Sequence, residues 1–202
     1  MTYWNHNSHY HDLILRQLPH SFGAALDIGS GTGDFAIRLA KRAQRVDAVE
    51  MDAQAVSVAR TRCAAFENIT LVTNDFLSYS FVAEQYDVVT ALASIHHMNL
   101  EQALMQAKRV LRPGGTLVIL GLYRKSSAVD YGFDVASTLA HQFLAWRNRD
   151  NIAPVSGVAV RVQEPGEDFG RIQTTTNQIL PNAKIQRRLL WRYTLVWKKP
   201  NA

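Results

Sequence analysis

The chain has 202 residues, of which 47% are hydrophobic and 19% are charged. These proportions exclude an intrinsically disordered chain, and the length fits one globular domain. The longest apolar run, at 116–122, is much shorter than the roughly 20 residues that a membrane-spanning helix needs. The first residues, MTYWNHNSHYHD, lack the basic and then apolar pattern of a signal peptide. The sequence therefore predicts a single soluble, cytoplasmic domain over residues 1–202, with no membrane partner.

The net charge is +5, and the basic excess lies near the C-terminus. Residues 181–202 contain six basic residues and no acidic one, whereas the rest of the chain is nearly balanced. A charged terminal strand pair also protects a sheet edge from aggregation, so the charge favours a solvated edge over a nucleic-acid surface. The lone Cys63 permits neither an internal disulfide nor a cysteine metal site.

Short apolar segments alternate with helical patterns, which is typical of an α/β domain with a mostly parallel sheet. The sequence predicts strands at 24–28, 46–49, 69–73, 86–92 and 116–122, and helices at 5–18, 34–43, 53–66 and 100–111. Arg112-Pro-Gly-Gly predicts a helix stop followed by a turn. Farther along, the sequence predicts helices at 127–149 and 168–179, a loop at 151–167, and an antiparallel strand pair at 183–191 and 193–198.

Three alternate glycines follow the first predicted strand, in the segment ALDIGSGTG at 25–33. Glycine permits a tight turn and lets a ligand approach the backbone, because it has no Cβ. A dinucleotide fingerprint reads G-x-G-x-x-G, whereas the glycines here are Gly29, Gly31 and Gly33, with Asp27 ahead of them. That acid suits the cationic amino acid end of a ligand better than a pyrophosphate, whose charge it repels.

Acidic residues also follow the second and third predicted strands. Glu50 ends the second strand, where a carboxylate can accept hydrogen bonds from both hydroxyls of a ribose. Asp75 follows the third strand and can accept from an adenine amino group, while Phe76 can pack on the adenine ring. We therefore expect a nucleoside-binding site at the carboxyl edge of the sheet. As a side chain at the end of a strand, Glu50 is expected to contribute little to folding.

In these motifs the chain resembles the class I S-adenosylmethionine-dependent methyltransferases, especially the small UbiE-like group. ALDIGSGTG resembles their first motif, VDAVEMD the second, TNDF the third, YDVVTALASIHHM the fourth, and LRPGGTLVIL the stretch into strand five. The resemblance covers residues 23–124. It implies a Rossmann-like, doubly wound, seven-stranded sheet of order 3-2-1-4-5-7-6, with strand 7 antiparallel and helices on both faces. The implied cofactor is S-adenosyl-L-methionine, with S-adenosyl-L-homocysteine as the product.

The resemblance also implies roles for particular residues. It places Asp27 and the turn glycines at the methionine end of the cofactor, Glu50 at the ribose and Asp75 at the adenine amino group. The remaining cofactor-binding residues are Gly29 and Gly31 in the turn, Met51 and Phe76 on the adenine faces, Ala91 at the end of strand four, and Tyr10 in the N-terminal helix.

Two adjacent histidines follow strand four, in the segment that passes beside the sulfonium of the cofactor. Methyl transfer needs an aligned nucleophile and often a base for its proton, and a histidine titrates near neutrality. We therefore expect His96 or His97 to be catalytic. The alternative is that one of the pair serves the hydrogen bonding of its own loop.

The N-terminal residues 1–22 are expected to form a helical lid over the cofactor, with Tyr10 closing the cavity. The alternative is that Trp4 and Tyr10 anchor this helix on the sheet edge. Four histidines fall in this region, but Asp12 is the one acid near them, so we predict no metal site. These histidines are His6, His9, His11 and His20.

Residues 125–202 are expected to supply the acceptor side of the domain, beside the cofactor-binding core at 23–124. Side chains that follow strand five, together with the loop at 151–167, are expected to wall an acceptor pocket. These side chains are Tyr123, Arg124, Tyr131 and Phe133. No Asn-Pro-Pro-Tyr type motif follows strand four, which further disfavours nucleic acid as the acceptor.

Together these features predict an enzyme that transfers a methyl group from S-adenosylmethionine to a small organic molecule. The acceptor atom, oxygen, nitrogen or carbon, stays open, as does the oligomeric state. The alternatives are an RNA or protein methyltransferase that uses the basic tail, and a regulatory protein that binds the cofactor without transferring its methyl group.

Overall fold

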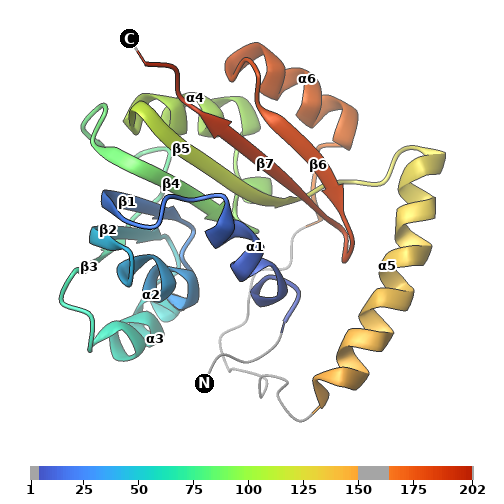
Figure 1. The fold of residues 1–202 in the computed structure, drawn as a ribbon, viewed down its shortest axis with the longest axis horizontal. Helices are drawn as coiled ribbons and strands as arrows, with labels where there is room; N and C mark the ends of the chain where they lie inside the picture. Colours follow the sequence, from blue (N-terminus) through green and yellow to red (C-terminus); the bar gives the residue numbers. More distant parts are fainter. Residues whose placement is uncertain (1–4, 150–163, 202) are drawn as a thin grey trace.

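The structure, a computed structural model, describes residues 5–149 and 164–201. A central sheet carries helices on both faces (Figure 1). The strands are β1 (Phe22–Ile28), β2 (Ala43–Glu50), β3 (Ile69–Thr73), β4 (Tyr86–Leu92), β5 (Leu111–Leu122), β6 (Lys184–Arg188) and β7 (Arg192–Lys198). The helices are η1 (Ser8–Tyr10), α1 (His11–Arg16), α2 (Asp34–Ala40), α3 (Ala53–Cys63), η2 (Ile95–His97), α4 (Leu100–Val110), α5 (Ala128–Arg147) and α6 (Phe169–Ile179).

The seven strands form one sheet in the order β3-β2-β1-β4-β5-β7-β6. Strands β1 to β5 run parallel to one another, whereas β7 runs antiparallel to both β5 and β6. This confirms the predicted fold class and strand order. Because the parallel strands all end at one edge, the segments that follow β1, β2, β3 and β4 meet there.

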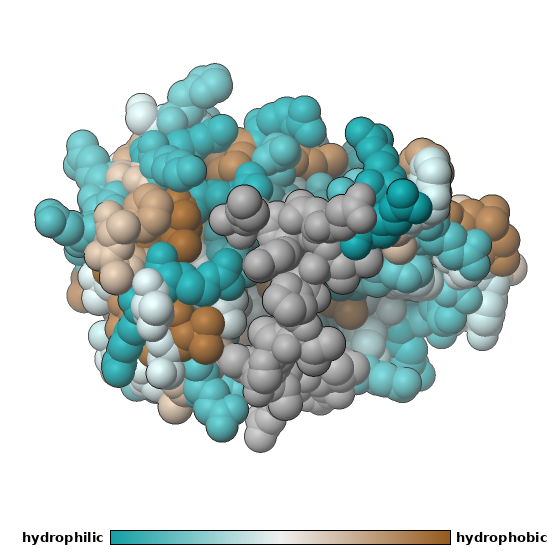
Figure 2. Space-filling view, turned by 90° about the horizontal axis from the view of Figure 1, so that it is seen from below, coloured by the Kyte–Doolittle hydropathy of each residue, from teal (hydrophilic) through white to brown (hydrophobic). Residues whose placement is uncertain are grey.

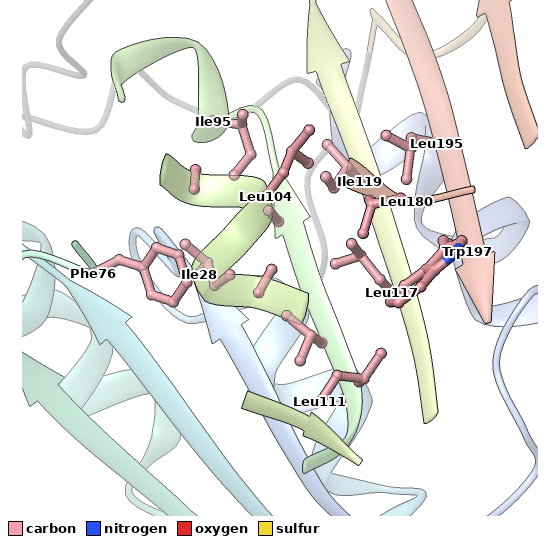
Figure 3. Close-up of a cluster of buried hydrophobic side chains, with 14 of the residues drawn as sticks. Ile28, Phe76, Ile95, Leu104, Leu111, Leu117, Ile119, Leu180, Leu195 and Trp197 are labelled. Carbon is pink, nitrogen blue, oxygen red and sulfur yellow. The ribbon is translucent and has the colours of Figure 1, made fainter. Parts of the chain in front are cut away.

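Alternation along the strands creates a core on each face of the sheet. On β1, Leu26 belongs to the cluster under α4 and α6, while its neighbour Ala25 belongs to the cluster under α1 and α2. Figure 3 shows the first cluster, where Leu104 of α4 and Leu180 after α6 meet Ile119 of β5. Each fully buried side chain of this size stabilises the fold by about 1.5–3 kcal/mol, so the two cores fix the sheet rigidly behind its carboxyl edge.

Two predicted elements differ from the structure in a way that matters for the site. The N-terminal helix predicted at 5–18 is a short 3-10 turn followed by the six residues of α1, and Trp4 lies outside the described residues. Arg112-Pro-Gly-Gly does not separate a helix from a strand by a free turn. It is an irregular part of β5, where Leu111 already pairs with Tyr86 before the register shifts. Of the loop predicted at 151–167, the structure describes only 164–167.

Helix α5 is attached to the end of the β6–β7 hairpin. The Arg187 guanidinium lies 3.0 Å from the carboxylate of Asp130, which is 1% exposed. The indole of Trp191, in the hairpin turn, donates to Asp134. The outer face of α5 exposes apolar side chains, among them Leu139 and Trp146. Figure 2 shows hydrophobic residues at the right-hand end of the molecule, the end at which Figure 1 places α5. Among the described helices, none has the length and apolar character needed to cross a membrane.

Candidate functional site

The turn after β1 has the conformation that its glycines predict. Gly29, Gly31 and Gly33 have φ values of +66°, +53° and +82°, which side chains with a Cβ rarely adopt. A Cβ on Gly29 would lie 2.3 Å from the Cβ of Ser94, so the turn packs directly against the segment after β4. Ser94 completes this contact by donating its hydroxyl to the Ile28 carbonyl at 2.6 Å. Glycine at position 29 is therefore required by both conformation and space.

Asp27 lies on β1, two residues before this turn, and is 2% exposed. Its Oδ1 accepts a hydrogen bond from the Thr90 hydroxyl at 2.8 Å, whereas its Oδ2 is buried without a partner. Burial, with a smaller contribution from the charge of Glu50, raises the pKa of Asp27 to about 7. An unpaired carboxylate oxygen in this position is costly unless a cationic donor comes to it.

Glu50 ends β2 beside the glycine turn and holds two backbone amides. One carboxylate oxygen accepts from the Gly31 amide and the other from the Asp52 amide, each at 2.9 Å. The expectation that Glu50 contributes little to folding is therefore wrong, because its side chain braces the turn between β1 and α2. A carboxylate has about four acceptor sites, so both oxygens can still receive further donors.

The adenine side of the predicted site is partly as expected. Met51 is 58% exposed next to Glu50, and Asp75 is half-buried, with one oxygen accepting from the Leu77 amide at 3.2 Å. Phe76, however, is 1% exposed and packs against Phe81 in the core. Figure 3 shows its ring pointing toward Ile28. The chain turns inward after β3, so this ring does not reach the surface where adenine was expected.

Two other predicted contacts are also buried. Ala91 has no exposed surface, because it lies between Ile28 of β1 and Ile119 of β5 in the middle of the sheet. Tyr10 is 6% exposed and donates its hydroxyl to the Leu189 carbonyl at 2.8 Å. Tyr10 thus anchors the N-terminal segment on the hairpin, as the alternative interpretation predicted, and its side chain does not open toward the glycine turn.

The histidine pair lies in η2, directly after β4. The two rings stack with centroids 3.9 Å apart, His97 being exposed and His96 half-buried. The Nδ1 atom of His96 is buried without a hydrogen-bond partner among the described residues. Burial, followed by the charges of His97 and Arg192, lowers the pKa of His96 to about 4. The imidazole is therefore neutral at pH 7 and is a weaker base than an exposed histidine.

A cavity of about 310 Å³ opens beside this pair at the carboxyl edge of β4 and β5. Its lining mixes apolar side chains with polar ones, among them the imidazoles of His96 and His97 and the carboxylate of Glu167. The principal lining side chains are Ile95, His96, Leu100, Leu122, Ile172 and Tyr193. Pro165 and Glu167 close one side, and this segment is tied to the end of β5 because the Arg124 amide donates to the Glu167 carbonyl at 2.8 Å.

Some residues of the site carry no signal in the sequence. In the sequence, Thr90 is an ordinary β-branched strand residue. Only the folded sheet brings its hydroxyl to Asp27, to which it donates a hydrogen bond. Tyr193 and Ile172 come from segments far along the chain, and only the position of β7 and α6 brings them to the cavity. Within the described part of the chain, no three histidine, cysteine or acidic side chains are arranged to hold a metal ion.

The geometry fits S-adenosylmethionine at its two polar ends. The ammonium of its methionine part needs an acceptor, and Asp27 offers a buried carboxylate oxygen without a partner. The ribose hydroxyls need an acceptor at the end of β2, where the Glu50 carboxylate lies beside the glycine turn. The described residues thus supply a complementary group for each end, although neither Phe76 nor Ala91 is accessible for the contact predicted for it.

Comparisons with known proteins agree with the fold. Residues 25–115 match a family model described as a methyltransferase domain. An uncharacterized methyltransferase of Mycobacterium tuberculosis is 28% identical, over 98% of this chain and 98% of that protein. A demethylmenaquinone methyltransferase of Deinococcus radiodurans is 36% identical, but over 51% of this chain and 44% of that protein. The N-methyltransferase NodS of Bradyrhizobium japonicum, solved with S-adenosylhomocysteine, superposes with a TM-score of 0.63 over 96% of this chain and 87% of that chain, at 15% identity.

The fold, the glycine turn and these matches define a class I S-adenosylmethionine-dependent methyltransferase. Within that class, the half of the chain that carries the motifs is similar to the UbiE-like enzymes, whereas the whole-length similarity is to methyltransferases without an assigned acceptor. The cofactor is S-adenosylmethionine.

Proposed function

We propose that the protein transfers the methyl group of S-adenosylmethionine to a small organic molecule bound in the cavity beside His96. The observation that carries this proposal is the position of the cavity. It begins where β4 and β5 end, next to the segment that packs on the glycine turn, and its volume of about 310 Å³ suits a small ligand. A second hollow, of about 320 Å³, lies at the opposite edge of the sheet around Gly23 and Pro113, away from these groups.

When bound, the cofactor supplies an electrophilic methyl group on a sulfonium. The protein's own contribution is positioning. Asp27 accepts the ammonium, Glu50 accepts the ribose hydroxyls, and Asp75 accepts the adenine amino group. Gly31 allows the approach, because the position that a Cβ would take there is open space, while Gly29 lets the turn pack against Ser94.

His96 is the residue we propose to take the acceptor's proton. Its Nδ1 is unpaired and buried, and its pKa of about 4 keeps the ring neutral at physiological pH. For an acceptor written X–H, the X–CH3 bond forms, the S–CH3 bond breaks, S-adenosylhomocysteine is released and the proton goes to His96.

A small acceptor fits the surface better than a nucleic acid does. The basic tail that suggested a polymer is largely engaged within the fold. Arg187 pairs with Asp130, Lys199 pairs with Glu84 at 3.0 Å, and Arg192 is buried. These cations therefore do not form an open basic surface for phosphates.

The test is a transfer assay with methyl-tritiated S-adenosylmethionine and a cell extract as the acceptor source. Label should appear in molecules below about 1 kDa, and treatment of the extract with nuclease and protease should leave the yield unchanged. Loss of the labelled product after either treatment would favour an RNA or protein acceptor. Calorimetric binding of S-adenosylhomocysteine without any transfer, across extracts from several growth conditions, would favour a regulatory protein instead.

A further inference from the structure

Helix α5 has an outer face that is exposed, apolar and uncharged. Six large apolar side chains on it are between 57% and 66% exposed, and together they form the α5 patch: Val129, Tyr131, Val135, Leu139, Phe143 and Trp146. Every other exposed position of the helix up to Trp146 also holds an uncharged residue. The acids of the helix, Asp130 and Asp134, are bound by the β6–β7 hairpin on the opposite side. A surface helix normally turns charged side chains toward water, so a face of this kind is expected to be covered.

The contacts of α5 with the rest of the chain explain why this face stays open. The helix stands beside the sheet, apart from the helices that cover it (Figure 1). Asp130 pairs with Arg187 near the start of the helix, and His141 lies 2.9 Å from His6 between the two ring nitrogens. Leu144 packs against the core beneath α1 and α2. These positions share one side of the helix at helical spacing, so the α5 patch lies on the other side.

The size of the α5 patch is close to one half of a protein interface. A fully buried aromatic side chain removes about 150–250 Å² from water, so the three exposed rings offer roughly 350 Å². The three aliphatic members, at about 100 Å² for each fully exposed side chain, bring the patch to roughly 500 Å². Monomeric proteins rarely expose more than a few hundred Å² of contiguous apolar surface. Two such patches placed face to face bury about 1,000 Å², which is the area that a specific interface needs.

The shape of the α5 patch is complementary to itself. Four of its side chains recur every four residues and form a ridge: Tyr131, Val135, Leu139 and Phe143. The adjoining exposed row, at positions 128, 132 and 136, consists of alanine, glycine and alanine, which leave a shallow groove. Helices pack by placing a ridge of this spacing into a groove of the same spacing on a neighbour. In a two-fold pair of α5 helices, each ridge therefore fits over the small residues of the other copy.

Gly132 in this groove is an independent indication of a close partner. Glycine weakens the interior of a helix relative to alanine. No side chain or other segment of the chain lies within 4 Å of the position that a Cβ would take at Gly132. Packing within the chain therefore does not require glycine here, whereas the close approach of a second helix does.

The charges of α5 favour a second copy over a membrane. Helices that lie on a membrane surface carry lysine and arginine along their polar side. In α5, two acids and no lysine or arginine precede Arg147. An uncharged apolar face is matched best by another uncharged apolar face, which an identical chain provides. We propose that the α5 patch is the contact between two copies of this chain in a two-fold dimer. The proposal does not depend on the methyl acceptor.

The first experiment is analytical ultracentrifugation of the full chain from about 1 to 200 µM, because interfaces of this size are often transient. We expect a dimer that dissociates on dilution. Leu139→Asp should weaken dimerisation about tenfold or more, because it buries an unpaired carboxylate in the contact. The matched control is Met105→Asp, which changes a 50% exposed side chain on α4 and should leave the dimer intact. A monomer over the whole range, or a dimer that Leu139→Asp does not weaken, would overturn the proposal.

The second variant, Gly132→Leu, separates a fitted contact from general apolar association. The leucine finds open space in the single chain, so the melting temperature of the monomer should not fall. It fills the groove that receives the partner's ridge, so dimerisation should weaken about tenfold or more. General apolar association would instead strengthen with the added leucine, and that result would overturn the proposal. Should Leu139→Asp not fold, Gly132→Leu decides the same question.

Two further measurements address other uses of the α5 patch. Flotation with vesicles of phosphatidylcholine and phosphatidylglycerol should leave the protein unbound. Vesicle binding that Leu139→Asp abolishes, in a protein that is monomeric in solution, would assign the patch to a membrane and overturn the proposal. Hydrogen exchange in α5 should slow as the protein concentration rises. Slowing that follows S-adenosylhomocysteine and not protein concentration would assign α5 to closure over the cofactor, and it would also overturn the dimer.

Discussion

Replacement of Asp27 by asparagine should have opposite effects on stability and on cofactor binding. Asp27 is 2% exposed, with one oxygen held by Thr90 and the other unpaired. Asparagine has nearly the same shape and can still accept the Thr90 hydrogen bond, but it cannot ionise. The substitution therefore isolates the effect of the charge.

The stability effect follows from the pKa of Asp27, which burial raises from 3.8 to about 7. The folded carboxyl binds its proton more tightly than the unfolded one does. Its favourable contribution is therefore complete below about pH 4 and is lost as the pH rises toward 7. At 1.36 kcal/mol per pKa unit, the loss is at most about 4 kcal/mol. Asp27→Asn removes this loss, so the cofactor-free protein should be more stable than the unmodified protein at pH 8 and should show less change between pH 5 and pH 8.

The binding effect has the opposite sign. A charge-assisted hydrogen bond from the ammonium of the cofactor contributes about 1.5–3 kcal/mol, so Asp27→Asn should weaken S-adenosylhomocysteine binding about 10- to 150-fold. Binding to the unmodified protein should also weaken by up to about tenfold per pH unit below pH 7, because the ligand requires the ionised carboxylate.

Urea denaturation of the cofactor-free protein at pH 5, 6, 7 and 8, with calorimetric titration of S-adenosylhomocysteine at each pH, tests both effects. Thr90→Val is the matched control, because it removes the hydrogen bond to Asp27 and keeps the charge. If Asp27→Asn left both the pH dependence of unfolding and the affinity unchanged, the reasoning about the buried carboxylate would be refuted.

Three further substitutions test the rest of the site. Glu50→Ala should weaken S-adenosylhomocysteine binding by roughly 2–4 kcal/mol, which calorimetry would measure as about 30- to 700-fold. It should also lower the melting temperature, because the Gly31 amide loses its acceptor. Normal affinity in a folded variant would exclude the ribose contact. His96→Ala should keep cofactor affinity within about twofold and lower the single-turnover methyl-transfer rate about 10²–10⁴-fold, and an unchanged rate would remove His96 as the base. Gly29→Ala should lower the melting temperature, because its Cβ would lie 2.3 Å from that of Ser94 at a φ of +66°, and stability equal to the unmodified protein would show that the turn is not so constrained.

The sequence by itself predicted an α/β domain from its alternating elements, and its resemblance to the class I methyltransferases implied the strand order and the cofactor. The glycine turn after β1, the acids after β2 and β3, and the final strand pair are local signals, and each acts within a few residues of its own strand. Such signals are readable because a glycine with positive φ, or an acid at a strand end, reflects a requirement of the backbone beside it.

The direction of individual side chains was decided by the tertiary structure. Phe76 and Ala91 lie where the motifs predict cofactor contacts. Both are nevertheless buried, because the hydrophobic core packs around their side chains. Glu50 stabilises the glycine turn because the turn after β1 folds back onto the end of β2. This brings the Gly31 amide to the Glu50 carboxylate, which accepts its hydrogen bond.

The acceptor side depended on the tertiary structure most strongly. Leu122, Ile172 and Tyr193 are far apart in the chain, and they meet only because β7 inserts between β5 and β6 while α6 packs beneath them. The burial of Arg192 has the same origin. A basic residue in a basic tail is expected to be solvated, and only the packing of the N-terminal segment against β7 shows that Arg192 is buried and bonded to Asn7. Burial and pairing are long-range properties, which is why the local motifs indicated the cofactor, whereas the positions of the buried side chains followed only from the fold.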